Sequence, residues 1–235
     1  MKFSGTFIIV VAIFITILIT SNIVAIKLIH IATLPNLFLG SALIFLPASI
    51  IAFPISYIIG DILTEVYGFR AARGVIWLGF ACNILVAMIL WVTGIIPGVI
   101  FWEDQAAYNT ILGQFPLILL GSFIAYLIGE FSNSATLAIL KVSTNGKHLW
   151  LRTIGSTIVG QGFDSFIFIF IAFGISGVLS PETLFRTALL QWWAKIGYEA
   201  LATPITYAVV NYIKRKEQID VYNAPKSLNP FGIFK

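Results

Sequence analysis

The sequence predicts an all-α, polytopic membrane protein with six transmembrane helices, and two observations support this prediction. Hydrophobic residues make up 59% of the 235 residues, whereas only 10% are charged. Soluble domains carry about 25% charged residues, so the charges here are too few to cover the surface of a soluble globule. The apolar residues also gather in runs close to the ~20 residues that one transmembrane helix requires.

Six apolar runs are the predicted transmembrane helices. The first, Gly5–Ile26, is too long for the apolar part of a signal peptide and lacks a small-x-small cleavage site, so we expect it to be retained. The other five are Leu37–Gly60, with an extension to Tyr67 left open, Gly74–Ile96, Pro116–Leu140, Thr153–Val178 and Leu189–Ile213. Residues 1–213 are therefore expected to form one transmembrane domain, and residues 214–235 a basic tail.

The positions of Lys and Arg predict the orientation of these helices. Of the 14 Lys and Arg, 11 lie at the N-terminus, in the loops after the second and fourth helices and in the tail, whereas two lie in the opposite loops. Cytoplasmic segments carry the excess of positive charge, so both termini are expected in the cytoplasm. The outer segment Phe101–Gln114 contains Trp102 and Tyr108 and is expected to anchor at the membrane interface.

Ionisable residues inside the predicted helices are the candidate functional residues, because such a charge costs about 2.5–3.5 kcal/mol in a bilayer and usually has a role. Asp164 lies roughly 16 Å into the fifth helix, near the membrane midplane. Gln161 shares its face, and Gly160 and Gly162 leave room for close approach. We expect Asp164 and Gln161 to contact a substrate. The alternative is an Asp that only hydrogen-bonds a neighbouring helix.

Lys195 and Glu199 are one turn apart in the sixth predicted helix, at a spacing that allows an ion pair along one helix face. Such a pair lowers the cost of burying both charges. Two interpretations stay open. Either the two residues only neutralise each other, or they act as a gate or in proton coupling while the substrate or another acid competes for Lys195.

Two acids lie near the cytoplasmic end of the second predicted helix. Asp61 and Glu65 are four residues apart, and like charges at this spacing repel each other. We therefore expect either cationic partners, for which Arg70 and Arg73 are available, or one protonated acid. Asp61 and Glu65 are candidates for an ion pair or for proton coupling.

Further polar and aromatic residues are expected to line the same half of the protein as candidate substrate contacts. Glu130 and Asn133 are three residues apart in the fourth helix, where interhelical hydrogen bonding is the alternative role. Tyr57 and Tyr126 lie about one turn from these acids and could contact a planar ligand. The pentapeptide from Tyr57 to Asp61 is similar to the one from Tyr126 to Glu130, although chance explains this match equally well.

Pro47 and Pro54 lie on about the same face of the second predicted helix. Proline removes a backbone donor and frees a carbonyl within a span. These residues therefore predict a kinked or broken helix beside a cavity.

Several functional classes lack their sequence signatures. No group of residues has the spacing of a metal site, and Cys82 is the single cysteine, so we expect neither a metal nor a disulfide. Phosphate-binding loops, dinucleotide fingerprints and hydrolase nucleophile motifs are absent. We therefore expect no cofactor, no nucleic-acid partner and no enzymatic activity. An intramembrane enzyme built on paired acids remains the rival class.

The segment of residues 54–68, Pro-Ile-Ser-Tyr-Ile-Ile-Gly-Asp-Ile-Leu-Thr-Glu-Val-Tyr-Gly, resembles the signature of the vitamin uptake transporter family, also known as queuosine precursor transporters. Later segments resemble the fourth, fifth and sixth helices of that family in order: Ser122–Asn133, Ser156–Asp164 and Lys195–Tyr207. Glu130 stands where some relatives are expected to have glutamine, and Asn133 where aspartate is expected.

The resemblance implies a multi-pass importer of the bacterial inner membrane that takes up 7-cyano- or 7-aminomethyl-7-deazaguanine for queuosine salvage in tRNA. Its partners are then the lipid bilayer and a small molecule. The excess of acids over Lys195 within the predicted helices favours secondary transport, with facilitated diffusion as the alternative. A guanine-type edge offers two adjacent N–H donors that one carboxylate can accept, and aromatic faces can stack on the ring. The alternative is the substrate-binding membrane subunit of an ATP-driven vitamin importer. The exact substrate, the coupling ion and association into homo-oligomers stay open.

Overall fold

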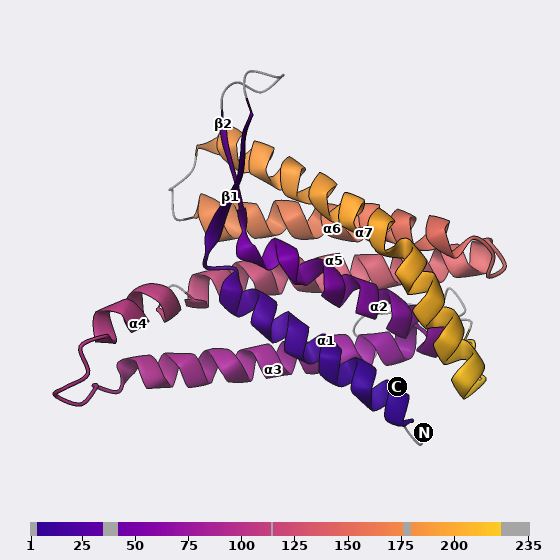
Figure 1. Cartoon of the computed structure of the whole chain (residues 1–235), viewed down its shortest axis with the longest axis horizontal. Helices are drawn as coiled ribbons and strands as arrows, with labels where there is room; N and C mark the ends of the chain where they lie inside the picture. The colour runs from indigo at the N-terminus through magenta and orange to yellow at the C-terminus, as the bar shows by residue number, and fades with distance from the viewer. Residues whose placement is uncertain (1–3, 35–41, 114, 176–179, 222–235) are drawn as a thin grey trace.

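The computed structural model describes residues 4–34, 42–113, 115–175 and 180–221, and most of them are helical. The helices are α1 (Gly5–Val24), α2 (Phe53–Tyr67), α3 (Phe69–Ile95), α4 (Gln105–Leu112), α5 (Phe115–Ser143), α6 (Leu149–Ile169) and α7 (Pro181–Glu217). The prediction of an all-α protein is confirmed, apart from one antiparallel hairpin of β1 (Leu28–Leu34) and β2 (Ala42–Pro47). Figure 1 shows the long helices bundled together, with the hairpin and α4 toward the end opposite the start of α1.

Within the described residues, four helical segments are long and apolar enough to cross a membrane. They are Gly5–Val24, Phe69–Ile95, Leu119–Ser143 and Leu149–Gly174, the last of which includes the π-helical turn η2 (Phe170–Gly174). Large apolar side chains such as Ile8 and Trp91 are exposed on the outside of these helices. Contiguous apolar surface of this kind suits contact with lipid, so the chain is a multi-pass membrane protein.

The second predicted span is only partly helical, which corrects the expectation for Leu37–Gly60. Residues 42–47 form strand β2, the 3-10 turn η1 (Ala48–Ile51) follows, and α2 begins at Phe53. Pro47 cannot donate a backbone hydrogen bond and ends the strand, and Pro54 lies in the first turn of α2, where no donor is needed. The prolines therefore break the segment, as their positions predict. Residues 37–41 lie outside the described part of the chain.

The sixth predicted span lies inside α7, which is longer than expected. This helix has 37 residues and continues past the predicted end at Ile213 to Glu217. It is not among the four most apolar segments, since its buried face carries Gln191, Lys195 and Glu199. Pro204 lies within the helix, and Figure 1 shows α7 changing direction along its length.

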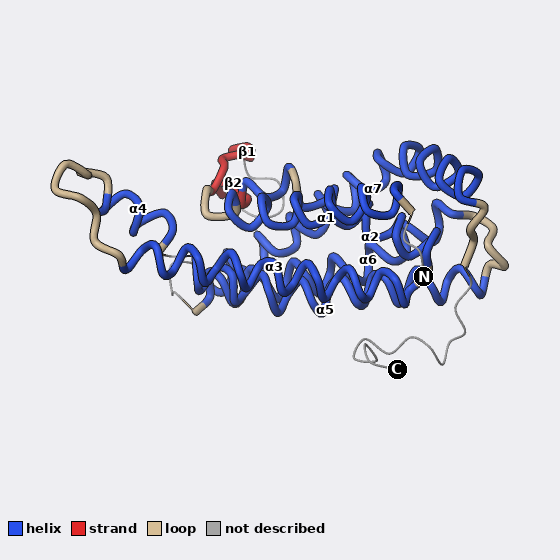
Figure 2. The backbone as a smooth tube through the Cα atoms, turned by 90° about the horizontal axis from the view of Figure 1, so that it is seen from below, coloured by secondary structure: helices blue, strands red, loops and turns tan. Residues whose placement is uncertain are grey.

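The two ends of the described chain meet at one end of the bundle. The Ser4 side chain caps α1 and also donates a hydrogen bond to Glu217 at the end of α7. The backbone nitrogen of Val221 lies 3.4 Å from the carbonyl oxygen of Val66, in the last turn of α2. The beginning of α1, the end of α2 and the end of α7 therefore share one end of the molecule, and Figure 2 shows these elements from below.

Glycines bring α2, α5 and α6 into close contact. A Cβ atom at Gly160 of α6 would lie 2.5 Å from the Asn133 Cβ and 2.8 Å from the Gly129 carbonyl oxygen of α5. A Cβ atom at Gly60 of α2 would lie 2.2 Å from the Glu130 Oε1 atom. Small residues at helix crossings are what allows membrane helices to approach so closely. This packing places the acids of three helices in one interior.

Candidate functional site

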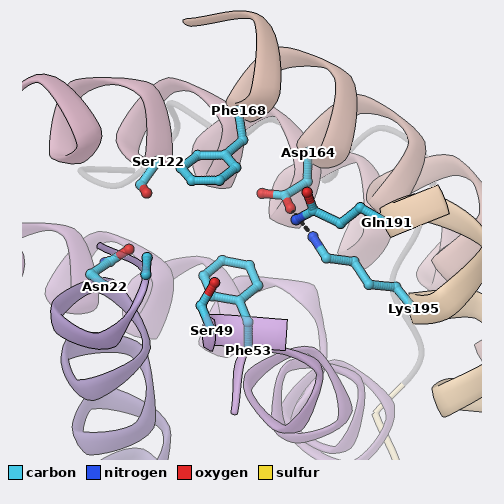
Figure 3. A pocket seen from close by; sticks show the side chains of 9 residues that line it. Asn22, Ser49, Phe53, Ser122, Asp164, Phe168, Gln191 and Lys195 are labelled. Carbon is cyan, nitrogen blue, oxygen red and sulfur yellow. Dashed lines mark hydrogen bonds and ion pairs between the residues drawn. The ribbon is translucent and has the colours of Figure 1, made fainter. Parts of the chain in front are cut away.

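A small polar cavity lies between the two sides of the bundle, and Figure 3 shows the side chains that surround it. Its free volume, about 10 Å³, is close to the space that one water molecule requires. Helices α1, α2, α5, α6 and α7 and the turn η1 contribute the lining, which we call the pocket: Asn22, Ala25, Ser49, Phe53, Ser122, Asp164, Phe168, Gln191 and Lys195.

An ion pair between Asp164 and Lys195 forms one wall of the pocket. The Lys195 ammonium group donates a hydrogen bond to Asp164 Oδ2, and both side chains are almost completely buried. The ammonium nitrogen also lies 5.1 Å from the centre of the Phe53 ring, within range of a cation–π interaction. Charge-assisted hydrogen bonding and the aromatic face together offset the cost of burying both charges.

The expected pair within α7 is therefore corrected. Lys195 reaches across to Asp164 of α6, and among the described residues no ion pair joins Lys195 to Glu199. The side chain of Glu199 is nonetheless buried, and its Oε1 atom has no hydrogen-bond partner. The acid that holds Lys195 is thus Asp164 of a neighbouring helix, and the choice between a gate and proton coupling stays a prediction.

The pocket contains only part of the predicted substrate-binding set. Asp164 lines it, as does Lys195, whereas Gln161 is buried outside it. Gln191 takes the place expected for Gln161, one turn before Lys195 on the same face of α7. Sequence reasoning missed Gln191, although its spacing of four residues from Lys195 was a usable signal.

Asn22 is a second missed residue, and it lies on α1. Its side-chain amide donates to the Asn83 side-chain oxygen at a distance of 2.8 Å, which joins α1 to α3. An asparagine near the end of an apolar run gives a weaker sequence signal than a charged residue.

A second group of polar residues lies outside the pocket lining and contains predicted site residues. Asn133 donates a hydrogen bond to Asp61 across the α2–α5 contact at 2.6 Å, and Glu130 lies against Gly60. Ser134 lies 3.5 Å from Glu130 Oε1 and 3.0 Å from the Thr64 hydroxyl. The structure therefore brings Asp61, Glu130 and Asn133 together.

Tyr57 and Tyr126 are buried beside this polar group and do not line the pocket. A Cβ atom at Gly129 would lie 2.7 Å from the Tyr57 hydroxyl oxygen and 2.8 Å from the Asp164 Cβ. The two similar pentapeptides thus contact each other, because Tyr57 of α2 meets Gly129 of α5 and Glu130 of α5 meets Gly60 of α2.

Glu65 is the centre of a network of charges at the end of the bundle where the chain ends meet. Its carboxylate lies 2.7 Å from both Arg152 and Lys214, and 3.5 Å from Lys141. Lys141 and Lys214 also pair with Asp220, at 2.5 Å and 3.0 Å. We call these five residues the Glu65 network. Of the two alternatives given for Glu65, cationic partners or a protonated acid, the structure shows cationic partners, and these come from α5, α6 and α7.

The same network changes the acidity of Asp220, which follows α7. Burial alone would raise the pKa of the Asp220 carboxyl, but hydrogen bonds from Lys141 and Lys214 hold that pKa below its ordinary value. The charged form of Asp220 is thus stabilised. The network ties α2, α5, α6 and α7 together with the segment after α7.

Apolar membrane-crossing helices around a buried polar pocket define a multi-pass membrane protein with an interior suited to a small polar solute. Comparison with known proteins gives the particular family. Residues 47–209 match the family described as "Putative vitamin uptake transporter". The chain belongs to this family, which consists of transporters and not of enzymes.

One curated relative is the "Probable queuosine precursor transporter" of Bacillus subtilis (strain 168). It is 31% identical to this chain over 165 residues, which cover 67% of this chain and 69% of the relative. No solved structure matches the fold. The comparisons therefore support a membrane transporter, and the pocket is its candidate substrate site.

Proposed function

We propose that this protein imports 7-deazaguanine precursors of queuosine across the inner membrane of a bacterium, as a secondary transporter that serves queuosine salvage in tRNA. The two expected substrates are 7-cyano-7-deazaguanine and 7-aminomethyl-7-deazaguanine. The observation that carries the proposal is the buried Asp164–Lys195 pair in the wall of the pocket. The name of the Bacillus subtilis relative supports the choice of substrate.

The Asp164–Lys195 pair complements the edge of a guanine-type base. That edge presents two adjacent N–H donors next to one carbonyl acceptor. The Asp164 carboxylate can accept both donors, and the Lys195 ammonium group can donate to the carbonyl. Phe53 and Phe168 offer aromatic faces on which the flat ring can stack. The substrate would thus replace the direct contact between the two charges without leaving either unpaired.

The pocket is too small for a bicyclic base in the closed form described here. A free volume of about 10 Å³ admits about one water molecule. Substrate entry therefore requires the helices to separate, and alternating access around a central site is the usual mechanism of secondary transporters. The Glu65 network lies at one end of the bundle and is suited to hold that end closed.

The proposal includes six membrane crossings with both termini in the cytoplasm. The Ser4–Glu217 hydrogen bond supports this topology, because an even number of crossings returns the chain to its starting side. The cationic residues of the Glu65 network lie at this same end, in agreement with the positive-inside rule. The second crossing would combine α2, which alone is only 15 residues long, with η1 and part of the hairpin.

Transport by the purified chain in liposomes tests this function. Radiolabelled 7-cyano-7-deazaguanine should enter liposomes that contain this protein and no other. Unlabelled 7-aminomethyl-7-deazaguanine should compete, whereas adenine and riboflavin should not. In cells unable to make or import these precursors, expression of the chain should restore queuosine in tRNA, as measured by mass spectrometry of tRNA hydrolysates.

The outcome also separates the two transport classes. Uptake into liposomes without an ATPase identifies an autonomous secondary transporter. Specific binding without uptake would instead identify a substrate-binding subunit that needs an ATP-driven module. Neither binding nor uptake of any 7-deazaguanine by the folded protein would refute the proposed function.

A further inference from the structure

Three buried carboxyl groups lie beside the pocket but do not line it: Asp61 of α2, Glu130 of α5 and Glu199 of α7. Each is at most 2% exposed. Each also has one oxygen atom without a hydrogen-bond partner, namely Asp61 Oδ2, Glu130 Oε2 and Glu199 Oε1. We call these three residues the carboxyl cluster.

The carboxyl cluster has no cationic partner within the described part of the chain. The ion pairs found there use the carboxylates of Asp164, Glu65, Asp220 and Glu182. Lys195, the cation of the pocket, is already paired with Asp164. A buried carboxylate without a counter-charge is so costly that such groups bind a proton instead.

The groups that face the carboxyl cluster are acids and tyrosines, and the acids add to the cost of ionising its carboxyls. Asp61 interacts electrostatically with Glu199, Glu130 and, further away, Glu65. Glu130 interacts with Asp164, and Tyr57 and Tyr126 contribute neutral hydroxyl groups from α2 and α5. Lys195 and the cations of the Glu65 network already form ion pairs with Asp164, Glu65 and Asp220, so within the described residues no ion pair compensates a charge on the cluster.

Two helices, α5 and α7, place members of the carboxyl cluster next to residues that contact or line the pocket. In α5, Glu130 directly follows Gly129, and a Cβ atom at Gly129 would lie 2.8 Å from the Asp164 Cβ. In α7, Glu199 lies one turn beyond Lys195, so the ammonium group can reach either Asp164 or Glu199 by a rotamer change. The ionisation of Glu199 thus decides which acid competes best for Lys195.

We propose that the Asp61–Glu130–Glu199 carboxyl cluster is a proton-binding site, separate from the substrate pocket, that couples import to the proton gradient through Lys195. This inference rests on the proposed function and adds the coupling ion. With the cluster protonated, Lys195 remains in the pocket beside Asp164 and can donate to the substrate carbonyl. When the open cytoplasmic side removes a proton, ionised Glu199 draws Lys195 away and the substrate is released.

The test compares two transport assays on the full-length protein in liposomes. One is uptake of labelled 7-cyano-7-deazaguanine driven by an inward proton gradient. The other is exchange of labelled for unlabelled substrate with no gradient. For one proton per substrate, one pH unit should sustain up to about tenfold accumulation by the wild-type protein. The Glu199→Gln and Asp61→Asn variants should lose this accumulation while they continue to exchange substrate.

Glu182→Gln is the matched control, because Glu182 lies on the same helix α7 but is exposed and pairs with Arg186. This variant should retain both accumulation and exchange. Retention of gradient-driven accumulation by both Glu199→Gln and Asp61→Asn would overturn the assignment of the proton site.

A measurement on the wild-type protein keeps the inference testable if a variant fails to fold. Addition of substrate outside should acidify the interior of the liposomes, as reported by an enclosed pH-sensitive dye. Substrate exchange without acidification or gradient-driven accumulation would refute proton coupling and leave the proposed function standing. Absence of both exchange and uptake would instead refute the proposed function.

Discussion

Lys195 of α7 pairs with Asp164 of α6 in the wall of the pocket, although Glu199 lies only one turn away along its own helix. This pairing places one positive and one negative charge side by side in an otherwise neutral wall. It also leaves Glu199 with an unpartnered oxygen atom. The interior thus holds one neutralised ion pair next to a cluster of acids. The contribution of each to stability can be measured with variants.

Removal of one partner from the buried pair should be more harmful than removal of both. Lys195→Met leaves the Asp164 carboxylate buried without a counter-charge and should lower the free energy of unfolding by about 3–5 kcal/mol. The double variant Lys195→Met with Asp164→Asn should recover most of this loss. Thermal unfolding in detergent measures the difference. Equal instability of the single and double variants would show that the pair is not energetically coupled.

Gln191 should contribute to substrate binding, because its side chain lines the pocket and its Oε1 atom lacks a partner. Gln191→Leu removes one neutral hydrogen bond and should weaken binding of 7-cyano-7-deazaguanine about tenfold, or about 1.4 kcal/mol. Gln161→Leu is the control, since Gln161 is equally buried but lies outside the pocket. Isothermal titration calorimetry should show a much smaller effect for the control. A larger loss of affinity in Gln161→Leu than in Gln191→Leu would support the sequence-based expectation that Gln161 contacts the substrate.

The sequence predicts which polar residues are buried better than it predicts their partners. Local spacing places Asp61, Glu130, Asp164 and Lys195 inside helices, and all four are buried. Spacing along one helix also suggests Glu199 as the partner of Lys195, yet the true partner comes from another helix. A contact between helices depends on how they pack, and a single sequence contains little direct information about that packing.

The second predicted helix also shows what a single sequence does not reveal. Apolar composition alone made Leu37–Gly60 a candidate span, because length and hydropathy do not distinguish a helix from a strand. The prolines correctly indicated a break, but not that β2 precedes it. Likewise the sequence offers Arg70 and Arg73 as cations close to Glu65, whereas the ion pairs of Glu65 are with residues of α5, α6 and α7.

Glycines at the contacts of α5 with α6 should tolerate no larger residue. Gly129→Ala and Gly160→Ala each place a Cβ within 3.0 Å of neighbouring backbone and side-chain atoms, and should destabilise the protein by about 1–3 kcal/mol. Gly197→Ala is the matched control, because no atom beyond its own turn of helix lies within 4 Å of the new Cβ. Alanine favours the helix there and should stabilise by up to about 1 kcal/mol. Comparable melting temperatures for all three variants would contradict the close packing.

Reporter fusions should establish the topology. Fusions in the loop between α5 and α6, near Lys147, and after Gln218 should report a cytoplasmic location. A fusion near Glu103, in the loop between α3 and α4, should report an external one. The expectation follows from the distribution of Lys and Arg and from the contact of Ser4 with Glu217. An external signal from the fusion after Gln218 would exclude the proposed six crossings.

Glu65 should be the most sensitive residue of the Glu65 network, because a single buried carboxylate neutralises cations from three helices. Glu65→Gln leaves Arg152 buried without its acidic partner and should lower the free energy of unfolding by about 3–5 kcal/mol. Glu182→Gln removes an exposed ion pair of α7 and should cost less than about 1 kcal/mol.

The loss of stability in Lys214→Met should be intermediate between those of the two variants, since Lys214 is 20% exposed and shares Glu65 with Arg152. Thermal unfolding at low and high salt separates these cases, because screening by salt weakens exposed pairs much more than buried ones. If Glu65→Gln unfolds at the same temperature as Glu182→Gln, the network does not hold this end of the bundle closed, and closure must then depend on apolar packing of α2 against α7.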